Sequence, residues 1–393
     1  MPSPPHSGDD AAERRLRVAL DATPLLGRPT GVGAFCAGAL AGLARRPELS
    51  VAAFAVSWRR RRGIGPLTPP GVSTGQRAMP ARPLQAAWAR RDRPAIELFI
   101  GPVDVVHGTN FVVPPARRAA RVATVHDLTT VRFPELCDRP TLAYPGLIRR
   151  ALGRGAWVHT PSAFVAAEVV EALGADPERV RAVPSGVPAL PEPAAGCDAE
   201  VAGRILPPGT DRYVLAVGTA EPRKDLPGLV RAFDELAGAR PGVSLVLAGP
   251  GGWGSDELNR ALGRSAFPDR VARTGWLDDD QLSSLLRRAA VLAYPSLYEG
   301  FGFPPLQAMA AGVPVVATRA GALPEVLGDA AELVAPGDHE ALAAALARVL
   351  DSAAVRDDLV ARGRRRAACF TWDRCAEGLA ALYRDARADR GGR

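Results

Sequence analysis

Lysine is almost absent from this chain of 393 residues. Of its 49 basic residues, every one is arginine except Lys224. An ammonium group is a compact, strongly hydrated point charge, whereas a guanidinium is a broad planar fork. The lone lysine is therefore either a product of chance in an arginine-biased chain or the sign of a tight place that admits only the smaller cation.

Cysteine and histidine are scarce as well, with five residues of each kind. No two cysteines have the CxxC spacing and their number is odd, so the sequence indicates neither a zinc site nor a disulfide framework. The histidines show no metal-ligand spacing. We therefore expect no metal, no cofactor and a reducing, cytoplasmic environment.

Long apolar segments are missing too. No hydrophobic run reaches about 18 residues, which predicts that no helix spans a membrane. The opening residues lack the apolar segment of a secretory signal, so we expect residues 1–14 to form a disordered leader. The remaining composition, 47% hydrophobic and 23% charged, is ordinary for a globular chain with room for two domains.

Positive charge is concentrated in the first half of the chain. Residues 1–195 have a net charge of +9 and residues 196–393 a net charge of −2. This asymmetry indicates either an anionic partner or a solvated arginine-rich surface. Tryptophan accompanies arginine in Trp58–Arg62 and Trp88–Arg93, which suits peripheral contact with the inner face of an anionic membrane. We expect no nucleic acid partner, because few aromatic residues are interleaved with the charge.

Short, unbroken apolar runs alternate with helix-like periodic stretches. This pattern is typical of parallel strands buried on both faces and predicts an α/β protein with two doubly wound, Rossmann-like domains. The expected strands are Leu16–Leu20, Val51–Ser57, Asp104–His107, Val122–His126, Trp157–Thr160 and Val180–Val183 in the first half, and Tyr213–Val217, Ser244–Ala248, Val271–Thr274, Ala290–Tyr294, Val313–Ala317 and Ala331–Val334 in the second.

A stretch rich in proline, glycine and alanine, Pro188–Thr210, separates the two sets of strands. We expect a first domain at 15–190, a linker at 191–210, a second domain at 211–368 and a C-terminal helix at 369–388 that packs back across the domains. The last segment is amphipathic and follows a completed second sheet, as such a helix requires.

The lone lysine lies in the motif GTAEPRKD, residues 218–225, between a predicted strand and a predicted helix. Ligands of open α/β sheets bind at the carboxyl ends of strands, and the N-terminus of a helix favours an anion. Gly218, Thr219, Arg223 and Lys224 are therefore candidates for binding a diphosphate. A solvated pair of surface cations is the alternative.

A second motif, YEGFGFPPLQ at residues 298–307, also follows a predicted strand. Glycine lets backbone approach a ligand closely, and proline suits the first turn of a helix. A carboxylate, backbone N–H groups and a carboxamide would converge here and could bind sugar hydroxyls and a ribose diol. The candidate residues are Glu299, Gly300, Phe301, Gly302, Phe303 and Gln307. An ordinary strand–turn–helix connection is the alternative.

Two features of the first half complete the candidate site. Gly31 and Gly33 follow the first predicted strand and open a helix, and a flexible turn is the alternative for them. His126 ends another predicted strand, where its ring could donate to a sugar hydroxyl or to developing charge. A structural histidine is the alternative there.

An acidic run, Asp278–Asp280, invites comparison with a metal site. Asp278 followed by Gln281 before an apolar periodic run is, however, a capping-box pattern. We therefore predict that this run starts a helix.

Together these motifs resemble family 4 glycosyltransferases of the fold called GT-B, and most of all their mannosyltransferase-like members. The resemblance is carried by GTAEPRKD, LVLAGPGGWGSDEL, RTGWLDDDQL, YPSLYEGFGFPPLQAMAAGVPVVA and LPEVLGDAAELVAPGD in the second half, and more loosely by TGVGAF, HGTNFVVP, VHDLT and VPSGV in the first. It implies two domains facing a central cleft. The second domain would bind most of a nucleotide-sugar donor, and the first would receive a glycan or lipid-linked acceptor.

The resemblance also implies roles for single residues. The family signature, two glutamates separated by seven residues, maps to Glu299 beside the donor sugar and to Gln307 beside the ribose. Gln307 departs from the signature, because an amide lacks the charge and the second acceptor oxygen of a carboxylate. The basic residues at the donor diphosphate map to Arg223 and Lys224. A histidine beside the sugar maps to His126, and the Gly31–Gly33 loop lies near the donor phosphates.

We therefore expect a retaining, metal-independent transferase that moves a hexosyl group, with mannose favoured, from a nucleoside diphosphate sugar to an acceptor. Two alternatives stay open: a non-catalytic scaffold, because of Gln307, and a nucleotide-sugar epimerase. A nicotinamide oxidoreductase is disfavoured, because no GxGxxG motif follows the first predicted strand.

Overall fold

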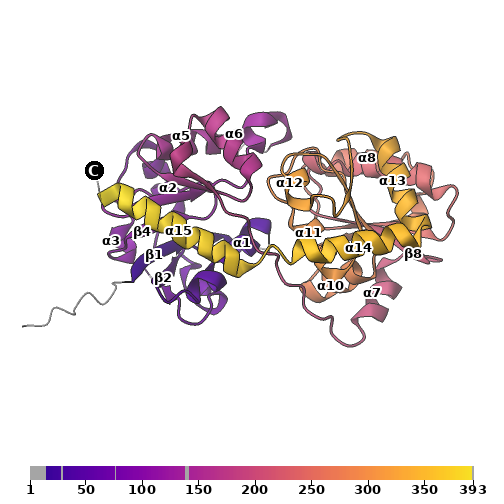
Figure 1. Cartoon of the computed structure of the whole chain (residues 1–393), viewed down its shortest axis with the longest axis horizontal. Coiled ribbons are helices and arrows are strands. Elements are labelled where there is room, and N and C mark those ends of the chain that lie inside the picture. The colour runs from indigo at the N-terminus through magenta and orange to yellow at the C-terminus, as the bar shows by residue number, and fades with distance from the viewer. Residues whose placement is uncertain (1–14, 28–29, 76, 138–140, 392–393) are drawn as a thin grey trace, which may run out of the picture.

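A computed structural model describes residues 15–27, 30–75, 77–137 and 141–391. The chain folds into two α/β domains that lie side by side (Figure 1). The predicted class, two doubly wound domains with parallel sheets, is confirmed. The predicted leader at 1–14 lies outside the described residues.

The first domain is built on a seven-stranded sheet with the strand order β3-β2-β1-β4-β5-β6-β7. Every neighbouring pair is parallel. The strands are β1 (Leu16–Asp21), β2 (Leu49–Phe54), β3 (Ser73–Thr74), β4 (Val105–Gly108), β5 (Ala120–Thr124), β6 (Trp157–Thr160) and β7 (Val180–Ala182), and the α-helices are α1 (Gly31–Ala44), α2 (Ala81–Arg90), α3 (Glu97–Ile100), α4 (Thr129–Arg132), α5 (Tyr144–Leu152) and α6 (Ala163–Leu173).

The second domain is built on a six-stranded sheet with the order β10-β9-β8-β11-β12-β13, again parallel throughout. Its strands are β8 (Arg212–Val217), β9 (Val243–Ala248), β10 (Val271–Gly275), β11 (Val291–Tyr294), β12 (Val315–Thr318) and β13 (Glu332–Val334), and its α-helices are α8 (Leu226–Ala237), α9 (Ser255–Leu262), α10 (Asp279–Arg288), α11 (Phe303–Ala311), α12 (Leu323–Leu327), α13 (His339–Asp351) and α14 (Ala353–Ala367).

Both sheets reverse their direction of winding at one place. In the first sheet β1 lies beside β4, and in the second β8 lies beside β11. Loops that follow two such neighbouring strands diverge to opposite faces and leave room for a ligand between them. This topology brings the two motifs of the second half together, since one follows β8 and the other follows β11.

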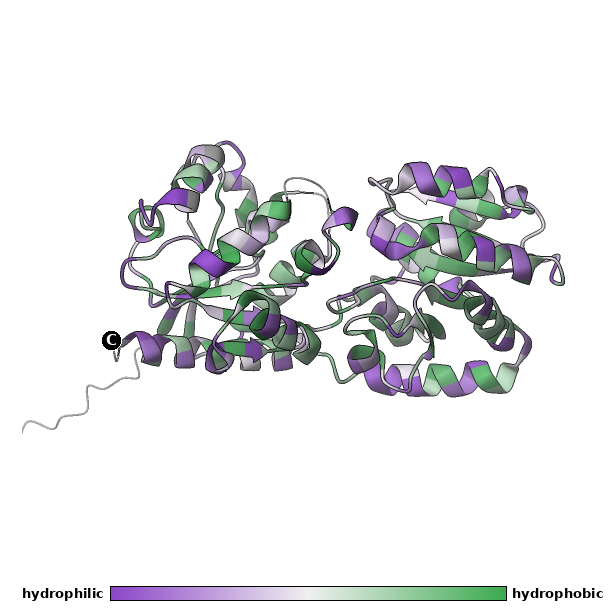
Figure 2. Ribbon diagram, turned by 90° about the horizontal axis from the view of Figure 1, so that it is seen from above, coloured by the Kyte–Doolittle hydropathy of each residue, from purple (hydrophilic) through white to green (hydrophobic). Residues whose placement is uncertain are grey.

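Helix amphipathicity accounts for the layers. Hydrophilic and hydrophobic residues alternate along the helices, while the strands are mainly hydrophobic (Figure 2). All four residues of β11 and of β12 are buried. Helices therefore cover both faces of a sheet whose strands need no polar side.

The segment expected to be a linker contains a helix. Within 191–210 lies α7 (Cys197–Ile205), whose Asp198 accepts a hydrogen bond from Ser284 of α10 at 2.5 Å. Val201 of this helix is buried in the core of the second domain. Composition alone suggested a linker. The segment forms a helix instead, because packing of Val201 against the second domain stabilises it.

The last helix, α15 (Trp372–Gly391), returns to the first domain (Figure 1). Leu379, Leu382 and Tyr383 are buried in the same core as α1 and β1. The chain therefore crosses between the domains twice, once before α7 and once after α14.

The domains touch through the loops at the carboxyl ends of their strands. Ser162 Oγ, at the start of α6, donates to the carbonyl of Gly300 at 2.9 Å. Glu325 of α12 accepts from the backbone N–H groups of Ala163 and Phe164 at 2.8 and 2.9 Å. The second domain therefore caps a helix of the first, and a carboxylate at a helix N-terminus is stabilising.

Within the described residues, no helix is long and apolar enough to cross a membrane.

Candidate active site

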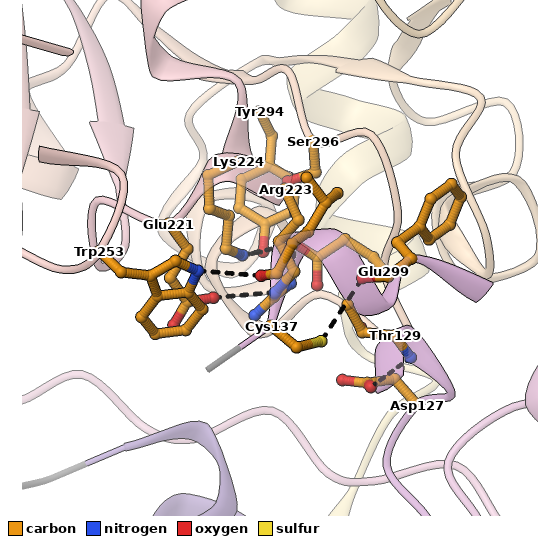
Figure 3. A network of polar contacts seen from close by, with 12 residues as sticks. Asp127, Thr129, Cys137, Glu221, Arg223, Lys224, Trp253, Tyr294, Ser296 and Glu299 are labelled. Carbon is orange, nitrogen blue, oxygen red and sulfur yellow. Dashed lines mark hydrogen bonds and ion pairs between the residues drawn. The ribbon is translucent and has the colours of Figure 1, made fainter. Parts of the chain in front are cut away.

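Lys224 is buried at the switch point of the second sheet, with 9% of its surface exposed. It lies at the end of a short 3₁₀ helix, Pro222–Lys224, that follows β8. Its ammonium donates to Glu299 Oε1 and, at 2.6 Å, to the hydroxyl of Tyr294 (Figure 3). Its charge is therefore held between two oxygen atoms that come from β11 and the loop after it.

The surroundings of Lys224 explain why arginine is not found there. Its Nζ lies 4.5 Å from the centre of the Tyr294 ring, and a Cβ atom on Gly218 would lie 3.6 Å from its Cε. Gly218 has a φ of +152°, which favours glycine. A planar guanidinium is wider than an ammonium and would need space that the ring and the loop already fill.

Glu299 Oε1 accepts three hydrogen bonds. The donors are Lys224 Nζ, Arg223 Nη1 at 2.9 Å and Ser296 Oγ at 2.8 Å. Burial alone would raise the pKa of Glu299, but the positive charges of Arg223 and Lys224 outweigh it and lower the pKa to about 2. Among the described residues all three bonds go to Oε1, which leaves Oε2 for a ligand.

Arg223 joins this cluster to two more carboxylates. Its Nε donates to Glu221 at 2.8 Å, and the negative charges of Glu299, Glu221 and Asp127 together raise its pKa against the effect of burial. Asp127 belongs to the first domain, so the cluster spans both domains (Figure 3). Two cations therefore face three carboxylates: Glu299 and Glu221 pair with them directly, and Asp127 acts on Arg223 through its charge alone.

The second motif forms the loop and helix that were predicted. Gly302, with a φ of +103°, caps α11, and Phe301 is buried. Pro304 and Pro305 have no N–H group, so the backbone donors of this end belong to 301–303 and to the residues after the prolines. At the N-terminus of α11, anion binding would therefore depend on the N–H groups of the loop more than on those of the first helical turn.

Gly300 is a point of close approach between the domains. A Cβ atom there would lie 1.9 Å from the carbonyl oxygen of His126 and 3.0 Å from Cβ of Asp127. Only glycine lets the two loops approach so closely. The structure thus brings Gly300 and the backbone of His126 together.

The imidazole of His126 has a defined tautomer. Its Nε2 lies 2.8 Å from the carbonyl of Thr109, and a carbonyl can only accept, so Nε2 carries the proton. Burial lowers the pKa of His126, which keeps the ring neutral. The other nitrogen, Nδ1, is then an acceptor, so this ring can accept from a sugar hydroxyl. The sequence suggested a donor, and the contact with Thr109 changes that role.

Gly31 and Gly33 open α1, which faces α11. A Cβ atom on Gly31 would lie 3.6 Å from the ring of Phe303, and Thr30 caps the helix by accepting from the N–H of Gly33 at 3.2 Å. Phe303 also packs against the cores of both domains. The two helix N-termini therefore meet at the domain interface.

Gln307 and Thr219 lie at the edges of this site. The amide nitrogen of Gln307 lies 3.3 Å from the carbonyl of Pro188, a long contact, which leaves its oxygen for another partner. Thr219 packs against the loop after β9, where a Cβ atom on Gly252 would lie 2.8 Å from its methyl group. Neither contact joins these residues to the cluster of Arg223, Lys224 and Glu299.

Sequence reasoning missed four residues of the cluster. Tyr294, Ser296, Glu221 and Asp127 were given no role, although each lies within five positions of a residue that was. Their types carried no signal of their own. The signal that could have found them is position, because all four follow the carboxyl end of a strand or end one.

The acidic run after β10 behaves as predicted. Asp278 accepts from the N–H of Gln281 at 2.8 Å, and the Gln281 side chain accepts from the N–H of Asp278, which confirms the capping box. Among the described residues, no group of three or more His, Cys, Asp or Glu side chains is arranged to hold a metal.

The two tryptophan–arginine stretches differ in the structure. Trp58 is 60% exposed beside exposed arginines, whereas Trp88 is only 7% exposed and donates to the carbonyl of Pro94 at 2.9 Å. Trp88 is part of a hydrophobic core. The suggestion that Trp88 faces a membrane is therefore wrong, whereas the suggestion for Trp58–Arg62 stays a prediction.

Comparison with known proteins covers nearly the whole chain. Residues 29–189 match the family described as Glycosyltransferase Family 4, and residues 200–366 match Glycosyl transferases group 1. The O-antigen chain mannosyltransferase B of Escherichia coli is 30% identical over 77% of this chain and 77% of its own length. A D-inositol 3-phosphate glycosyltransferase of Acidothermus cellulolyticus is 32% identical over 73% and 68%.

An MMP alpha-(1->4)-mannosyltransferase of Mycolicibacterium hassiacum is 37% identical, over 58% of this chain and 54% of its own length. Among solved structures, a sucrose-phosphate synthase from Thermosynechococcus elongatus superposes with a TM-score of 0.73 at 21% identity, covering 95% of this chain and 100% of that one. An Anabaena protein, HepE, solved with UDP and glucose, superposes with a TM-score of 0.70 at 16% identity, covering 93% and 99%.

Proposed function

The chain belongs to glycosyltransferase family 4 and is a glycosyltransferase of the GT-B fold. On this premise we propose that it moves a hexosyl group, with mannose favoured, from a nucleoside diphosphate sugar. The acceptor would be a hydroxyl of a glycan, a lipid or a small molecule. We propose further that the anomeric configuration is retained and that no metal is needed. Two relatives are named as mannosyltransferases, which supports the choice of sugar.

One observation carries the proposal. Arg223, Lys224 and Glu299 form a buried cluster at the switch point of the second sheet, where the loops of both domains meet. Two fixed cations at that place match the charge of a departing diphosphate. In a buried site such cations act more strongly than in water, because little solvent screens them.

The donor would exchange partners with this cluster. Its diphosphate would lie against Arg223 and Lys224 and compete with Glu299 for their charge. Glu299 Oε2 would accept from a hydroxyl of the donor sugar, and the amides of 301–303 would donate to phosphate oxygens. As the bond between sugar and diphosphate breaks, the cations stabilise the negative charge that moves onto the leaving phosphate.

His126 would orient the sugar. Its Nδ1 accepts, so it would bind a sugar hydroxyl while Nε2–H stays on the carbonyl of Thr109. The backbone carbonyl of His126 lies against Gly300 of the other domain, which supports a position near the domain interface. Closure of the domains there would exclude water and limit hydrolysis of the donor.

We propose that the acceptor enters from the first domain. The exposed side chains of Trp58, Arg59, Arg60 and Arg62 would lie against an anionic surface, such as the inner face of a cytoplasmic membrane, if the acceptor is lipid-linked. Flotation with vesicles of acidic and of neutral lipid tests this contact, and equal recovery in both would contradict it.

A non-catalytic scaffold is the second candidate. It rests on Gln307, which lacks the charge of the family glutamate and contacts Pro188 instead. The intact Arg223–Lys224–Glu299 cluster favours catalysis over this alternative, because a scaffold has no need of buried charges that cost free energy to desolvate.

Thermal shift of the purified chain tests the donor site. The panel is GDP, UDP, dTDP and ADP with their common sugars, each with and without EDTA, for wild type and Lys224→Ala. Stabilisation by one base that survives EDTA and disappears in Lys224→Ala supports the proposal and identifies the base. No shift with any nucleotide would favour the scaffold.

A further inference from the structure

Tyr298 belongs to the second domain but makes its polar contacts with the first. It directly precedes Glu299, and only 3% of its surface is exposed. Its hydroxyl accepts from the backbone N–H of Leu128 at 3.0 Å and donates to the carboxylate of Glu168 on α6. Both partners lie in the first domain. The residue next to Glu299 is therefore hydrogen-bonded across the domain interface.

The ring of Tyr298 also lies among side chains of the first domain. Its centre is 5.4 Å from that of Phe133 and 6.1 Å from that of Phe164. A buried tyrosine whose hydroxyl is also bonded is the kind of side chain that dominates the energy of an interface. We therefore regard Tyr298 as an anchor of the second domain in the first.

Glu168 is placed to receive the hydroxyl of Tyr298. It is 7% exposed, and its other oxygen accepts from Arg132 Nε at 2.8 Å. Burial, and after it the bond to Glu168, raises the pKa of Tyr298, so the phenol stays protonated and donates. A hydrogen bond to a carboxylate is about twice as strong as one between neutral groups. Separation of the domains would remove this bond and leave a buried carboxylate with one partner fewer, which is costly.

The backbone of Glu299 is held from both sides by the first domain. Tyr298 before it bonds to that domain, and the carbonyl of Gly300 after it accepts from Ser162 Oγ at 2.9 Å. The carboxylate of Glu299 instead pairs with the cations of the second domain, and its carbonyl accepts from the N–H of Ala322 at 2.8 Å. The position of Glu299 therefore depends on contacts from both domains.

From these contacts we propose that Tyr298 is a positioning residue for the transfer reaction. Its bonds to Leu128 and Glu168 fix the backbone of Glu299, so that the free Oε2 reaches the donor sugar only while the domains are closed. Tyr298 acts through its neighbour and does not touch the donor itself. The proposal rests on the proposed function, since it takes Glu299 as the residue that binds the sugar.

Titration calorimetry of the full chain separates the sugar contact from the diphosphate contact. The probes are GDP and GDP-mannose or, if thermal shift selects another base, the corresponding diphosphate and its sugar. Tyr298→Phe removes the hydroxyl and keeps the ring. It should weaken binding of the nucleotide sugar about tenfold, as the loss of one hydrogen bond to a charged group predicts, and change binding of the diphosphate by less than about threefold.

A second buried tyrosine provides the matched control. Tyr213 is 4% exposed, and its hydroxyl donates to the carbonyl of Leu285 at 2.7 Å within the second domain. Tyr213→Phe removes the same group from a similarly buried place, so both variants should lose similar stability. Only Tyr298→Phe should weaken the nucleotide sugar relative to the diphosphate. Equal ratios of the two dissociation constants in both variants would reduce Tyr298 to a stabilising residue and overturn the proposal.

Variants of Glu168 test the same contact from the first domain. Glu168→Gln keeps an oxygen that can accept from Tyr298, so binding of the nucleotide sugar should weaken by no more than about threefold. Glu168→Leu removes the acceptor and should reproduce the loss seen in Tyr298→Phe, which also covers a failure of that variant to fold. Wild-type affinity of Glu168→Leu for the nucleotide sugar would contradict the proposal.

Small-angle X-ray scattering without any ligand distinguishes this proposal from the proposed function. Tyr298→Phe should have a larger radius of gyration than the wild type and than Tyr213→Phe, because it loses bonds between the domains. Absence of nucleotide binding in the wild type would contradict the proposed function. Nucleotide binding in the wild type, with the same radius and the same ratio of affinities in Tyr298→Phe, would contradict the role of Tyr298 alone.

Discussion

Lys224 and Glu299 form a buried ion pair across the switch point of the second sheet, one contributed by the loop after β8 and the other by the loop after β11. The two residues are far apart in sequence and meet because their strands are neighbours. Arg223 and Ser296 donate to the same carboxylate oxygen. The pair therefore holds at one place a cation that could bind a diphosphate and a carboxylate that could accept from a sugar hydroxyl.

Replacing Lys224 tests the role of the smaller cation. Lys224→Ala should lower kcat about 10²- to 10³-fold, as the loss of one preorganised donor to a developing negative charge does. Lys224→Arg keeps the charge but meets the Tyr294 ring and the Gly218 backbone, so it should also lose at least tenfold in kcat. Initial rates with a saturating donor measure both effects.

Arg223→Lys is the control for that experiment. The side chain of Arg223 is less buried than that of Lys224. It donates to Glu221 and Glu299 through separate nitrogens. It should tolerate the exchange of cation better than Lys224. Full activity of Lys224→Arg would show that charge alone matters and that the lone lysine is a product of chance.

Glu299→Gln separates sugar binding from diphosphate binding. The change removes a carboxylate that competes with the donor for Arg223 and Lys224, so nucleoside diphosphate affinity should rise by up to about tenfold, roughly 1.4 kcal/mol. Transfer should fall, because the sugar loses its acceptor. Titration calorimetry with the nucleotide and initial rates of transfer give the two readouts.

Glu221→Gln is its counterpart. Glu221 pairs with Arg223 but does not contact Lys224 or the predicted sugar position. Nucleotide affinity should rise here as well, while transfer is retained. Weaker nucleotide binding in both variants would mean that these carboxylates organise the cations, and it would contradict a competition with the donor.

Gln307→Glu tests the departure from the family signature. A carboxylate adds an acceptor oxygen and a charge for the ribose diol, so the KM for the donor should fall about three- to tenfold with little change in kcat. The long contact with Pro188 would be lost, at a cost of about 1 kcal/mol or less. A large gain in kcat would instead support the scaffold as the natural state of this chain.

Glu325 is predicted to hold the domains together. It caps the N-terminus of α6 from the other domain, and Ser162 beside it donates to Gly300. Glu325→Ala should shift the chain toward an open arrangement, seen as a larger radius of gyration by small-angle X-ray scattering, and raise the KM for the donor. An unchanged radius together with unchanged kinetics would show that the remaining contacts suffice.

Sequence patterns predicted the parts of the fold that depend on local order. Buried strands such as β11 and β12 read as unbroken apolar runs, and the capping box at Asp278 needs only its own neighbours. The same holds for Lys224 and Glu299 as candidates, since strand ends in α/β sheets gather at one edge. What the patterns left out depends on contacts between distant segments.

Three residues illustrate that limit. Trp88 reads as a surface tryptophan among arginines but is buried, because its helix packs on the first sheet. His126 reads as a donor, and only the carbonyl of Thr109 reveals that its free nitrogen accepts. Tyr294 ends a strand like many tyrosines, and its hydroxyl becomes part of the site because Lys224 reaches it from the loop after β8.

A chain of buried hydrogen bonds leads to the last prediction. His159 Nε2 must donate to the carbonyl of Val183, so its Nδ1 accepts from Thr124, which in turn accepts from His107 Nε2. His107 Nδ1 then accepts from the hydroxyl of Tyr383 on α15, at 2.7 Å. Every donor in the chain points the same way, which requires both histidines to be neutral.

Neutral histidines make the stability of the protein depend on pH. Burial lowers the pKa of His159 to about 4, and burial also lowers that of His107 well below 6.5. Between pH 4 and 6.5 the unfolded chain therefore binds more protons than the folded one, so the free energy of unfolding rises with pH in this window. For His159 alone the difference amounts to about 3 kcal/mol, fully present above pH 6.5 and lost toward pH 4.

Urea unfolding at pH 7.5, 6 and 5 measures this dependence. His159→Gln should flatten it, because an amide can donate to Val183 and accept from Thr124 without titrating. His339→Gln is the control, since His339 is partly exposed beside Asp225 and lies outside the chain of bonds. A pH slope in His159→Gln equal to that of the wild type would mean that other groups cause the acid sensitivity and that this histidine is not kept neutral by its partners.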